Sequence, residues 1–154
     1  EIEQGTLGFE DTNDLTQEQE LIILNLVSMD KSNFDMNQVL TLLKNLDAKY
    51  VSGFFSHRDL SGNEVFRIAS GINPGLLETD TKTHVLLMAL DLSQANDPVK
   101  AFEMMLETAS NISEKLHASI CDAGRAPLSK QMIQHLKSKA QEVSHLKSMK
   151  NISA

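Results

Sequence analysis

The segment His57-Arg58-Asp59-Leu60, followed by Asn63, contains residue types that act together in phosphoryl transfer. In the catalytic loop of protein kinases an Asp accepts the proton of the substrate hydroxyl, and an Asn further along holds a metal ion. Asn63 stands one residue too close to Asp59 for that spacing, and the sequence contains neither a glycine-rich phosphate loop nor an Asp-Phe-Gly motif. We therefore interpret the segment as polar residues at a strand end rather than as a catalytic loop.

The remaining chemically active side chains are scattered along the chain. The histidines lack the short paired spacing of zinc sites; they are His57, His84, His117, His135 and His145. Cys121 is the single cysteine, so it cannot form an intrachain disulfide, and this usage is consistent with a reducing compartment. The sequence predicts no catalytic residues, no metal site and no cofactor, and we expect a protein that is not an enzyme.

Two predicted strands carry apolar side chains on both faces. In residues 83–92 (THVLLMALDL) one face receives Val85, Leu87 and Ala89, and the other receives Leu86, Met88 and Leu90. Residues 21–27 (LIILNLV) show the same pattern. An antiparallel strand with one face in water alternates apolar and polar residues, so something must cover, or bind to, the second face of these strands.

The elements that position these strands follow from spacing and caps. Apolar residues at helical intervals predict a helix over residues 36–46 behind the capping candidates Ser32 and Asp35, and a longer one that begins at Asp97-Pro98. A third helix is expected after Ser129. Strands are expected at residues 48–58 and 64–72, joined by a tight turn at residues 61–63, and a short strand at residues 118–122.

The order β-α-β-β-β-α-β-α in a chain of 154 residues predicts one α+β domain, with an antiparallel sheet and three helices on one face. Each helix has a single apolar stripe, so the other face of the sheet is expected to be an open apolar groove. We expect Leu86, Met88 and Leu90 to line this groove together with Leu21 and Ile23. Alternatively, a loop, the linker or a dimer partner covers this face, and these residues are ordinary core.

Charge is distributed unevenly along the chain. The formal net charge of −7 resides in residues 1–20, which hold seven acidic and no basic residues, whereas the rest of the chain balances 14 of each. A neutral domain excludes binding to a nucleic-acid backbone, which needs clustered basic residues. From Arg125 onward six basic residues face only Glu142; we interpret them as a solvated helix face, the alternative being attraction to acidic partners or lipid headgroups. The longest apolar run, residues 85–90, is too short to span a membrane.

Six segments in order, spanning residues 21 to about 146, resemble the carboxy-terminal domain of the ZipA family of bacterial cell-division proteins, which bind the tubulin-like FtsZ; they are LIILNL, SNFDMNQVL, FFSHRDLS, FRIASGINPG, FEMMLETASNISEKL and RAPLSKQMIQHL. The resemblance implies a split β-α-β fold whose uncovered sheet face receives the carboxy-terminal tail of FtsZ. Residues 20–147 would form this domain, residues 1–19 the disordered acidic remnant of a linker, and residues 148–154 a frayed tail.

The resemblance also implies a location and a role. Family members carry an amino-terminal membrane anchor and a Pro- and Gln-rich linker, so the domain would lie at the cytoplasmic face of the inner membrane and tether the division ring to it. Contact with the membrane would occur only through an anchor absent from this chain. The alternative is a small α+β ligand-sensing or dimerisation domain; a membrane span and Pro-rich linker elsewhere in the reading frame would favour the tethering protein.

Residue by residue, the peptide-binding cleft of the family falls here on Leu21, Ile23, Gly53, Phe55, Ala69, Gly71, Asn73 and Met88. Gly53 and Gly71 stand where the family pattern has methionines, and Asn73 stands where it has a lysine. Phe55 is larger than its counterpart and refills part of the space. These departures predict a cleft that is deeper and less basic than the family pattern.

Overall fold

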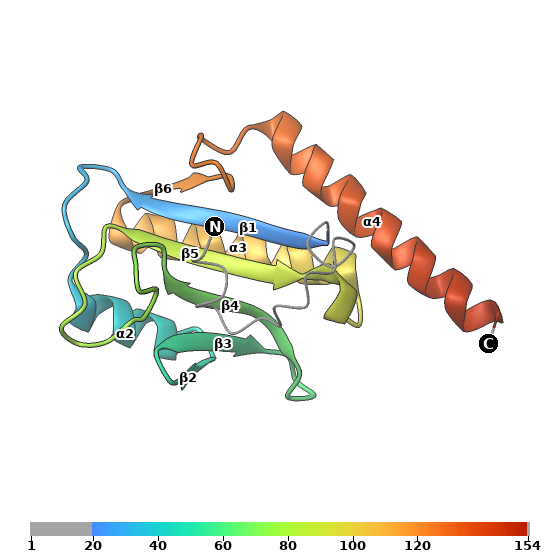
Figure 1. Cartoon of the computed structure of the whole chain (residues 1–154), viewed down its shortest axis with the longest axis horizontal. Helices are drawn as coiled ribbons and strands as arrows, with labels where there is room; N and C mark the ends of the chain where they lie inside the picture. The colour runs from blue at the N-terminus through green and yellow to red at the C-terminus, as the bar shows by residue number, and fades with distance from the viewer. Residues whose placement is uncertain (1–19, 154) are drawn as a thin grey trace.

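The computed structural model describes residues 20–153, so the expectations for residues 1–19 lie outside the described residues. The described residues form six strands, three α-helices and one short 3-10 helix (Figure 1). In chain order they are β1 (Leu21–Ser28), α2 (Met36–Asn45), β2 (Ala48–Val51), β3 (Phe54–Arg58), β4 (Glu64–Ser70), β5 (Val85–Asp91), η2 (Leu92–Gln94), α3 (Pro98–Leu116), β6 (Ala118–Cys121) and α4 (Lys130–Ser153).

The strands form one sheet in the order β2-β3-β4-β5-β1-β6, and every neighbouring pair is antiparallel. Figure 1 shows α3 running behind β1 and β5, while α4 starts near the β6 edge and descends past the end of the sheet toward the C-terminus. The longest helix, α4, contacts α3 and η2. None of the described helices combines the length and the apolar character that crossing a membrane would need.

The helices begin where the capping residues predict. The Asp35 carboxylate accepts a hydrogen bond of 3.0 Å from the backbone N–H of Asn37 at the start of α2. The Asp97 carboxylate accepts one of 3.2 Å from the backbone N–H of Lys100, and Pro98 occupies the first turn of α3, where its missing N–H costs nothing. The left-handed backbone of His117 (φ 55°) ends α3.

All three helices contribute to a single core on one side of the sheet. The buried cluster contains side chains of α2, α3 and α4 together with alternate residues of the central strands; among them are Val39, Leu43, Phe102, Met105, Ala140, Val143, Ile22, Leu24 and Leu26. Packing one apolar stripe per helix against one sheet face is the arrangement that the helix patterns predict. The predicted α+β class, with its antiparallel sheet and three helices, is confirmed.

One predicted strand is two strands. Residues 48–58 were expected to be continuous, but Ser52 and Gly53 form a two-residue turn between β2 and β3, with Val51 paired to Phe54. The φ angles of Ser52 (48°) and Gly53 (97°) are both positive, as in the mirror-image turns whose twist suits a β-hairpin. At the other end of the chain, α4 continues through residues 148–153, where we expected a frayed tail.

Candidate functional site

Strand pairing divides the sheet residues into two faces. Leu24 pairs with Met88, Met88 pairs with Ile68, and Ile68 pairs with Phe55, so these side chains form one row on the helix side. The row formed by Ile23, Ala89 and Arg67 points to the opposite face of the sheet. We call the face opposite the helices the outer face and define it by Leu21, Ile23, Phe54, Arg67, Ala69, Leu87 and Ala89.

The structure contradicts the predicted orientation of Met88 and Phe55. Both side chains are 0% exposed and pack in the helix-side core, as do Leu86 and Leu90. Alternation along β5 separates Leu86, Met88 and Leu90 from Val85, Leu87 and Ala89. Both sets are apolar, so the pattern does not indicate which set faces the helices. Only the pairing of β5 with β1 assigns Met88 to the side of Leu24.

The two glycines expected to deepen the cleft have neighbours in the space that a side chain would occupy. Gly53 is buried in the β2–β3 turn, and a Cβ there would lie 2.5 Å from Cδ2 of Leu76. At Gly71 a Cβ would lie 2.5 Å from Cγ1 of Val85. Real Cβ atoms do not approach other atoms so closely, so Leu76 and Val85 already fill the room that the glycines leave. Asn73 is exposed in the loop after β4.

An apolar patch remains at the centre of the outer face. Ala69 and Ala89 are fully buried beneath the partly exposed side chains of Ile23, Phe54 and Leu87. Of the residues predicted for the cleft, Leu21, Ile23 and Ala69 belong to this face. Phe54 and Leu87 were missed, although each is the immediate sequence neighbour of a residue that was assigned to the wrong face.

Arg67 is the charged residue within this patch. Its Nε donates to Oε2 of Glu64 at 2.6 Å, and its guanidinium carbon lies 4.7 Å from the centroid of the Phe54 ring. Oε1 of Glu64 accepts a further hydrogen bond from the Ser56 hydroxyl. The Arg67 guanidinium thus makes a cation–π contact with the Phe54 ring and is paired with Glu64.

The connection between β6 and α4 reaches across one end of the outer face. The Asn25 side chain donates to the carbonyl of Asp122 at 3.0 Å, and Nη2 of Arg125 donates to the carbonyl of Gly71 on the far side of β5 at 2.7 Å. Near the start of β1, Nζ of Lys139 donates to the carbonyl of Leu21 at 3.1 Å, and burial lowers the pKa of this lysine. A turn of this chain thus accounts for part of the cover over the second apolar face.

The residues examined for catalysis have structural surroundings. His57 stacks on Phe66 with ring centroids 4.6 Å apart, and burial lowers its pKa. The Asp59 carboxylate accepts the backbone N–H groups of Ser61 and Asn63 and so shapes the β3–β4 turn. Cys121 is buried, which raises the pKa of its thiol and disfavours the nucleophilic thiolate. Within residues 20–153 no three His, Cys, Asp or Glu side chains converge as metal ligands do.

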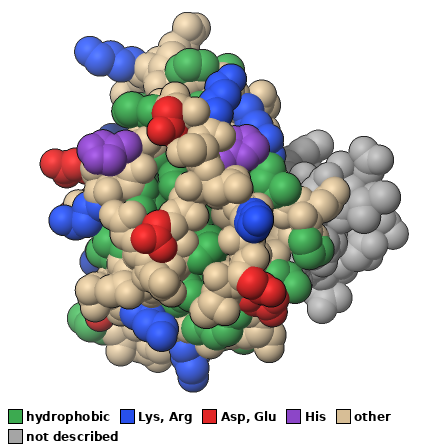
Figure 2. Space-filling model, turned by 90° about the vertical axis from the view of Figure 1, so that its left-hand side faces the viewer, with side chains coloured by type: hydrophobic (Ala, Val, Ile, Leu, Met, Phe, Trp, Pro, Cys, Tyr) green, Lys and Arg blue, Asp and Glu red, His purple; other side chains and the backbone are tan. Residues whose placement is uncertain are grey.

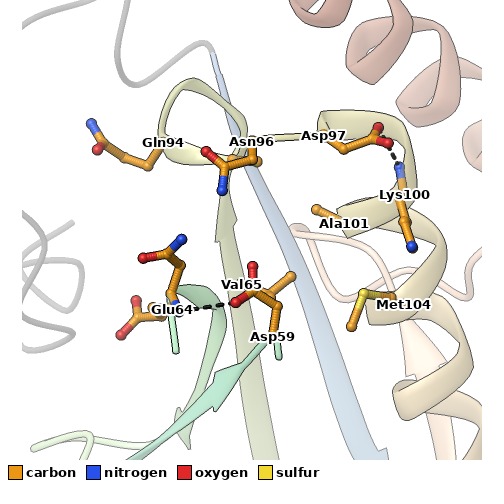
Figure 3. Close-up of a pocket in the computed structure, with 11 residues that line it drawn as sticks. Asp59, Glu64, Val65, Gln94, Asn96, Asp97, Lys100, Ala101 and Met104 are labelled. Carbon is orange, nitrogen blue, oxygen red and sulfur yellow. Dashed lines mark hydrogen bonds between the residues drawn. The ribbon is translucent and has the colours of Figure 1, made fainter. Parts of the chain in front are cut away.

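A separate pocket of about 540 Å³ lies between the β3–β4 turn, η2 and the start of α3 (Figure 3). Val65, Ala101 and Met104 supply apolar walls, and the carboxylates of Asp59 and Asp97 lie on opposite sides of the space. Both carboxylates accept backbone hydrogen bonds from their own turns. The pocket therefore offers shape and some polarity, without a group placed for chemistry.

Surface charge is mixed at the end of the molecule that carries α2 and the β4–β5 connection. Figure 2 shows Lys or Arg, Asp or Glu, and His side chains interspersed with apolar ones on this side. No field of one sign covers it, in keeping with the balanced charge of residues 21–154. This side offers no basic footprint for nucleic acid.

The family comparison is decisive for identity. A sequence model of the family described as "ZipA, C-terminal FtsZ-binding domain" matches residues 20–139. This chain belongs to that family. The resemblance predicted from the six segments is thus confirmed, and the matched range covers the whole sheet, α2, α3 and the first part of α4.

Full-length relatives place the ZipA-type domain among cell-division proteins. The Cell division protein ZipA of Colwellia psychrerythraea is 30% identical over 133 residues, which are 81% of this chain and 35% of the relative. The ZipA of Pseudomonas fluorescens strain Pf-5 is 23% identical over 92% of this chain and 52% of its own length. That of Stutzerimonas stutzeri is 25% identical over 80% and 48%. The chain therefore spans about a third to a half of the ZipA proteins that it matches.

Proposed function

We propose that this domain is a non-enzymatic adaptor that binds the carboxy-terminal tail of FtsZ on its outer face. The observation that carries the proposal is the apolar patch of Ile23, Phe54 and Leu87 over Ala69 and Ala89, on the one sheet face that the helices leave free. The family description, which names FtsZ binding, supplies the partner. Contiguous, partly exposed apolar surface on a small domain is typical of a peptide-binding site.

The energetics suit a weak, reversible contact. Burial of a few hundred Å² of apolar area contributes several kcal/mol at about 25 cal/mol per Å², before the cost of ordering the peptide is subtracted. The expected affinity of a single tail is therefore micromolar at best. Many tails on one FtsZ polymer would bind several such domains together and strengthen the attachment without new contacts. With an amino-terminal anchor of the family type, the domain would lie at the cytoplasmic face of the inner membrane and tether the division ring.

Titration of the ¹⁵N-labelled chain with a synthetic FtsZ tail peptide tests the site. We expect the amide signals of Ile23, Ala69 and Leu87 to shift more than those of the helix layer. A matched pair of variants sharpens the test: Leu87→Asp places a charge on the patch, whereas Leu60→Asp makes the same change at a fully exposed leucine in the β3–β4 turn. Leu87→Asp should weaken binding at least tenfold, because the charge must be desolvated against the peptide, and Leu60→Asp should not.

Three results would count against the proposal. One is the absence of any spectral change at millimolar peptide while the domain is folded. Another is equal weakening by Leu87→Asp and Leu60→Asp. A third is a dimer in sedimentation experiments that Leu87→Asp dissociates, because this would favour the alternative of a dimerisation domain.

A further inference from the structure

Asn25 is a polar residue in the row of side chains that forms the apolar patch. It lies two residues beyond Ile23 in β1, and therefore on the same outer face of that strand. Asn25 pairs with Leu87 of β5, and Leu87 pairs with Ala69 of β4. Side chains that pair across strands are direct neighbours on the sheet. A peptide lying across the strands on Ala69 and Leu87 would therefore meet Asn25 next.

The side-chain amide of Asn25 is buried but only partly satisfied. The residue is 2% exposed, and its Nδ2 donates to the carbonyls of Asp122 at 3.0 Å and of Ala123 at 3.5 Å. These two acceptors fix the orientation of the amide, because a flipped amide would place its oxygen against both carbonyls. Oδ1 of Asn25 has no hydrogen-bond partner among residues 20–150. A buried acceptor of this kind is unfavourable by itself, so an N–H group that reached it would be bound favourably.

The turn over Asn25 is held to the outer face by few contacts. We define the strap as residues 122–126, in the connection that follows β6. Residues 123–126 are exposed, so their own burial contributes little to holding the strap on the sheet. Within the strap, the Asp122 carboxylate accepts the backbone N–H groups of Gly124 and Ala126, so the strap has a shape of its own. Its hydrogen bonds to the outer face are the two from Asn25 and one from Arg125.

Arg125 fastens the far end of the strap. In the sheet, β1 and β5 separate β6 from β4, so this side chain reaches past two strands to the carbonyl of Gly71 after β4. The acceptor is a neutral carbonyl, and Arg125 is exposed to water, which offers it equivalent acceptors. Release of Arg125 from Gly71 therefore costs little and loosens the strap over Asn25.

We propose that the strap covers the polar end of the peptide site in the free domain, and that a peptide bound on the outer face displaces it. The peptide backbone then donates an N–H to Oδ1 of Asn25 and accepts a hydrogen bond from Nδ2 in place of the strap carbonyls. An extended backbone fits this position because it presents a donor and an acceptor together, as the amide does. The inference rests on the proposed function and adds to it a residue that positions the peptide backbone.

Arg125→Ala tests the strap, because it releases the far end and leaves the patch unchanged. We expect the FtsZ tail peptide to bind Arg125→Ala at least threefold more tightly than the wild-type chain, since the open form is more populated before binding. Lys115→Ala removes an exposed cation from α3 in the helix layer, and this control should leave the affinity unchanged. Equal or weaker binding by Arg125→Ala would overturn the strap. A buried water that satisfies Oδ1 of Asn25 in both states predicts this equal affinity.

A second pair of chains tests Asn25 itself. In the Arg125→Ala chain, Asn25→Leu keeps the approximate size of the side chain and removes the amide, so we expect at least threefold weaker binding. The side-chain NH₂ signals of Asn25 in the Arg125→Ala chain should shift at saturating peptide more than those of Asn111, an exposed residue of α3. Unchanged affinity or unshifted Asn25 signals would overturn this role, and the signals decide alone if Asn25→Leu does not fold.

Failure of this inference is distinguishable from failure of the proposed function. If the peptide binds the wild-type and Arg125→Ala chains with equal affinity, the proposed function stands and the strap is overturned. If millimolar peptide binds neither chain while both are folded, the proposed function and the strap are overturned together.

Discussion

Leu87 and Met88 are sequence neighbours on opposite faces of β5, and truncation of each to alanine should have different consequences. Met88 is 0% exposed and lies in the core between sheet and helices, so Met88→Ala leaves a sealed cavity. Such substitutions cost about 2–5 kcal/mol of unfolding free energy. A domain of this size has about 5–15 kcal/mol in total, so the loss is a large share of its stability.

Leu87 is partly exposed on the outer face, where solvent reaches its side chain. Leu87→Ala removes apolar contact with its neighbours but creates no enclosed void, so we expect a loss of about 1 kcal/mol. Urea denaturation followed by circular dichroism gives both free energies. Titration with the FtsZ tail peptide should show the opposite order, with weaker binding for Leu87→Ala and unchanged binding for Met88→Ala.

Two outcomes would refute this assignment of faces. If Leu87→Ala destabilises the domain as much as Met88→Ala, the outer face is buried as deeply as the core. If Met88→Ala leaves stability unchanged and weakens peptide binding, Met88 lies on the binding face after all, and the β1–β5 register must differ.

Three further predictions concern stability. Gly53→Ala should destabilise the β2–β3 turn by about 1–2 kcal/mol, because φ is 97° there and the new Cβ meets Leu76; Gly62→Ala, where a Cβ meets nothing within 4 Å and φ is 86°, isolates the backbone strain alone. Asp97→Ala should cost about 1 kcal/mol through loss of the α3 cap, and an unchanged melting temperature would contradict this role. Burial lowers the pKa of His57 below 6.5, so the folded state disfavours the charged form of this histidine. The unfolding free energy should therefore fall as pH drops below about 6.5. Denaturation curves at pH 7.5 and 5.5 measure this difference, and His57→Gln should make it smaller.

The sequence identifies the helices and their first turns because those signals are local. A carboxylate such as Asp35 or Asp97 can cap only the N–H groups that follow it within a few residues, and the apolar stripe of each helix is visible in its own spacing. The turn built by Asp59 is predictable for the same reason, since its hydrogen bonds go to Ser61 and Asn63. The class of fold and the family follow from the order of these elements.

The site is less accessible to sequence reasoning because it depends on which face of a doubly apolar strand the helices cover. Alternation with a period of two separates Leu87 from Met88 but treats both sets alike. The division is settled by non-local pairing, since Met88 lies opposite Leu24, and Leu24 belongs to the buried core that includes side chains of α3. In the same way, the Ser52-Gly53 turn interrupts a run of strand-forming residues, and only the pairing of Val51 with Phe54 separates two strands there. The local chemistry of the sequence therefore determined the helices and their first turns, whereas the tertiary structure decided where residues 48–58 divide into two strands and which side chains face the core, because both depend on contacts between separate segments of the chain.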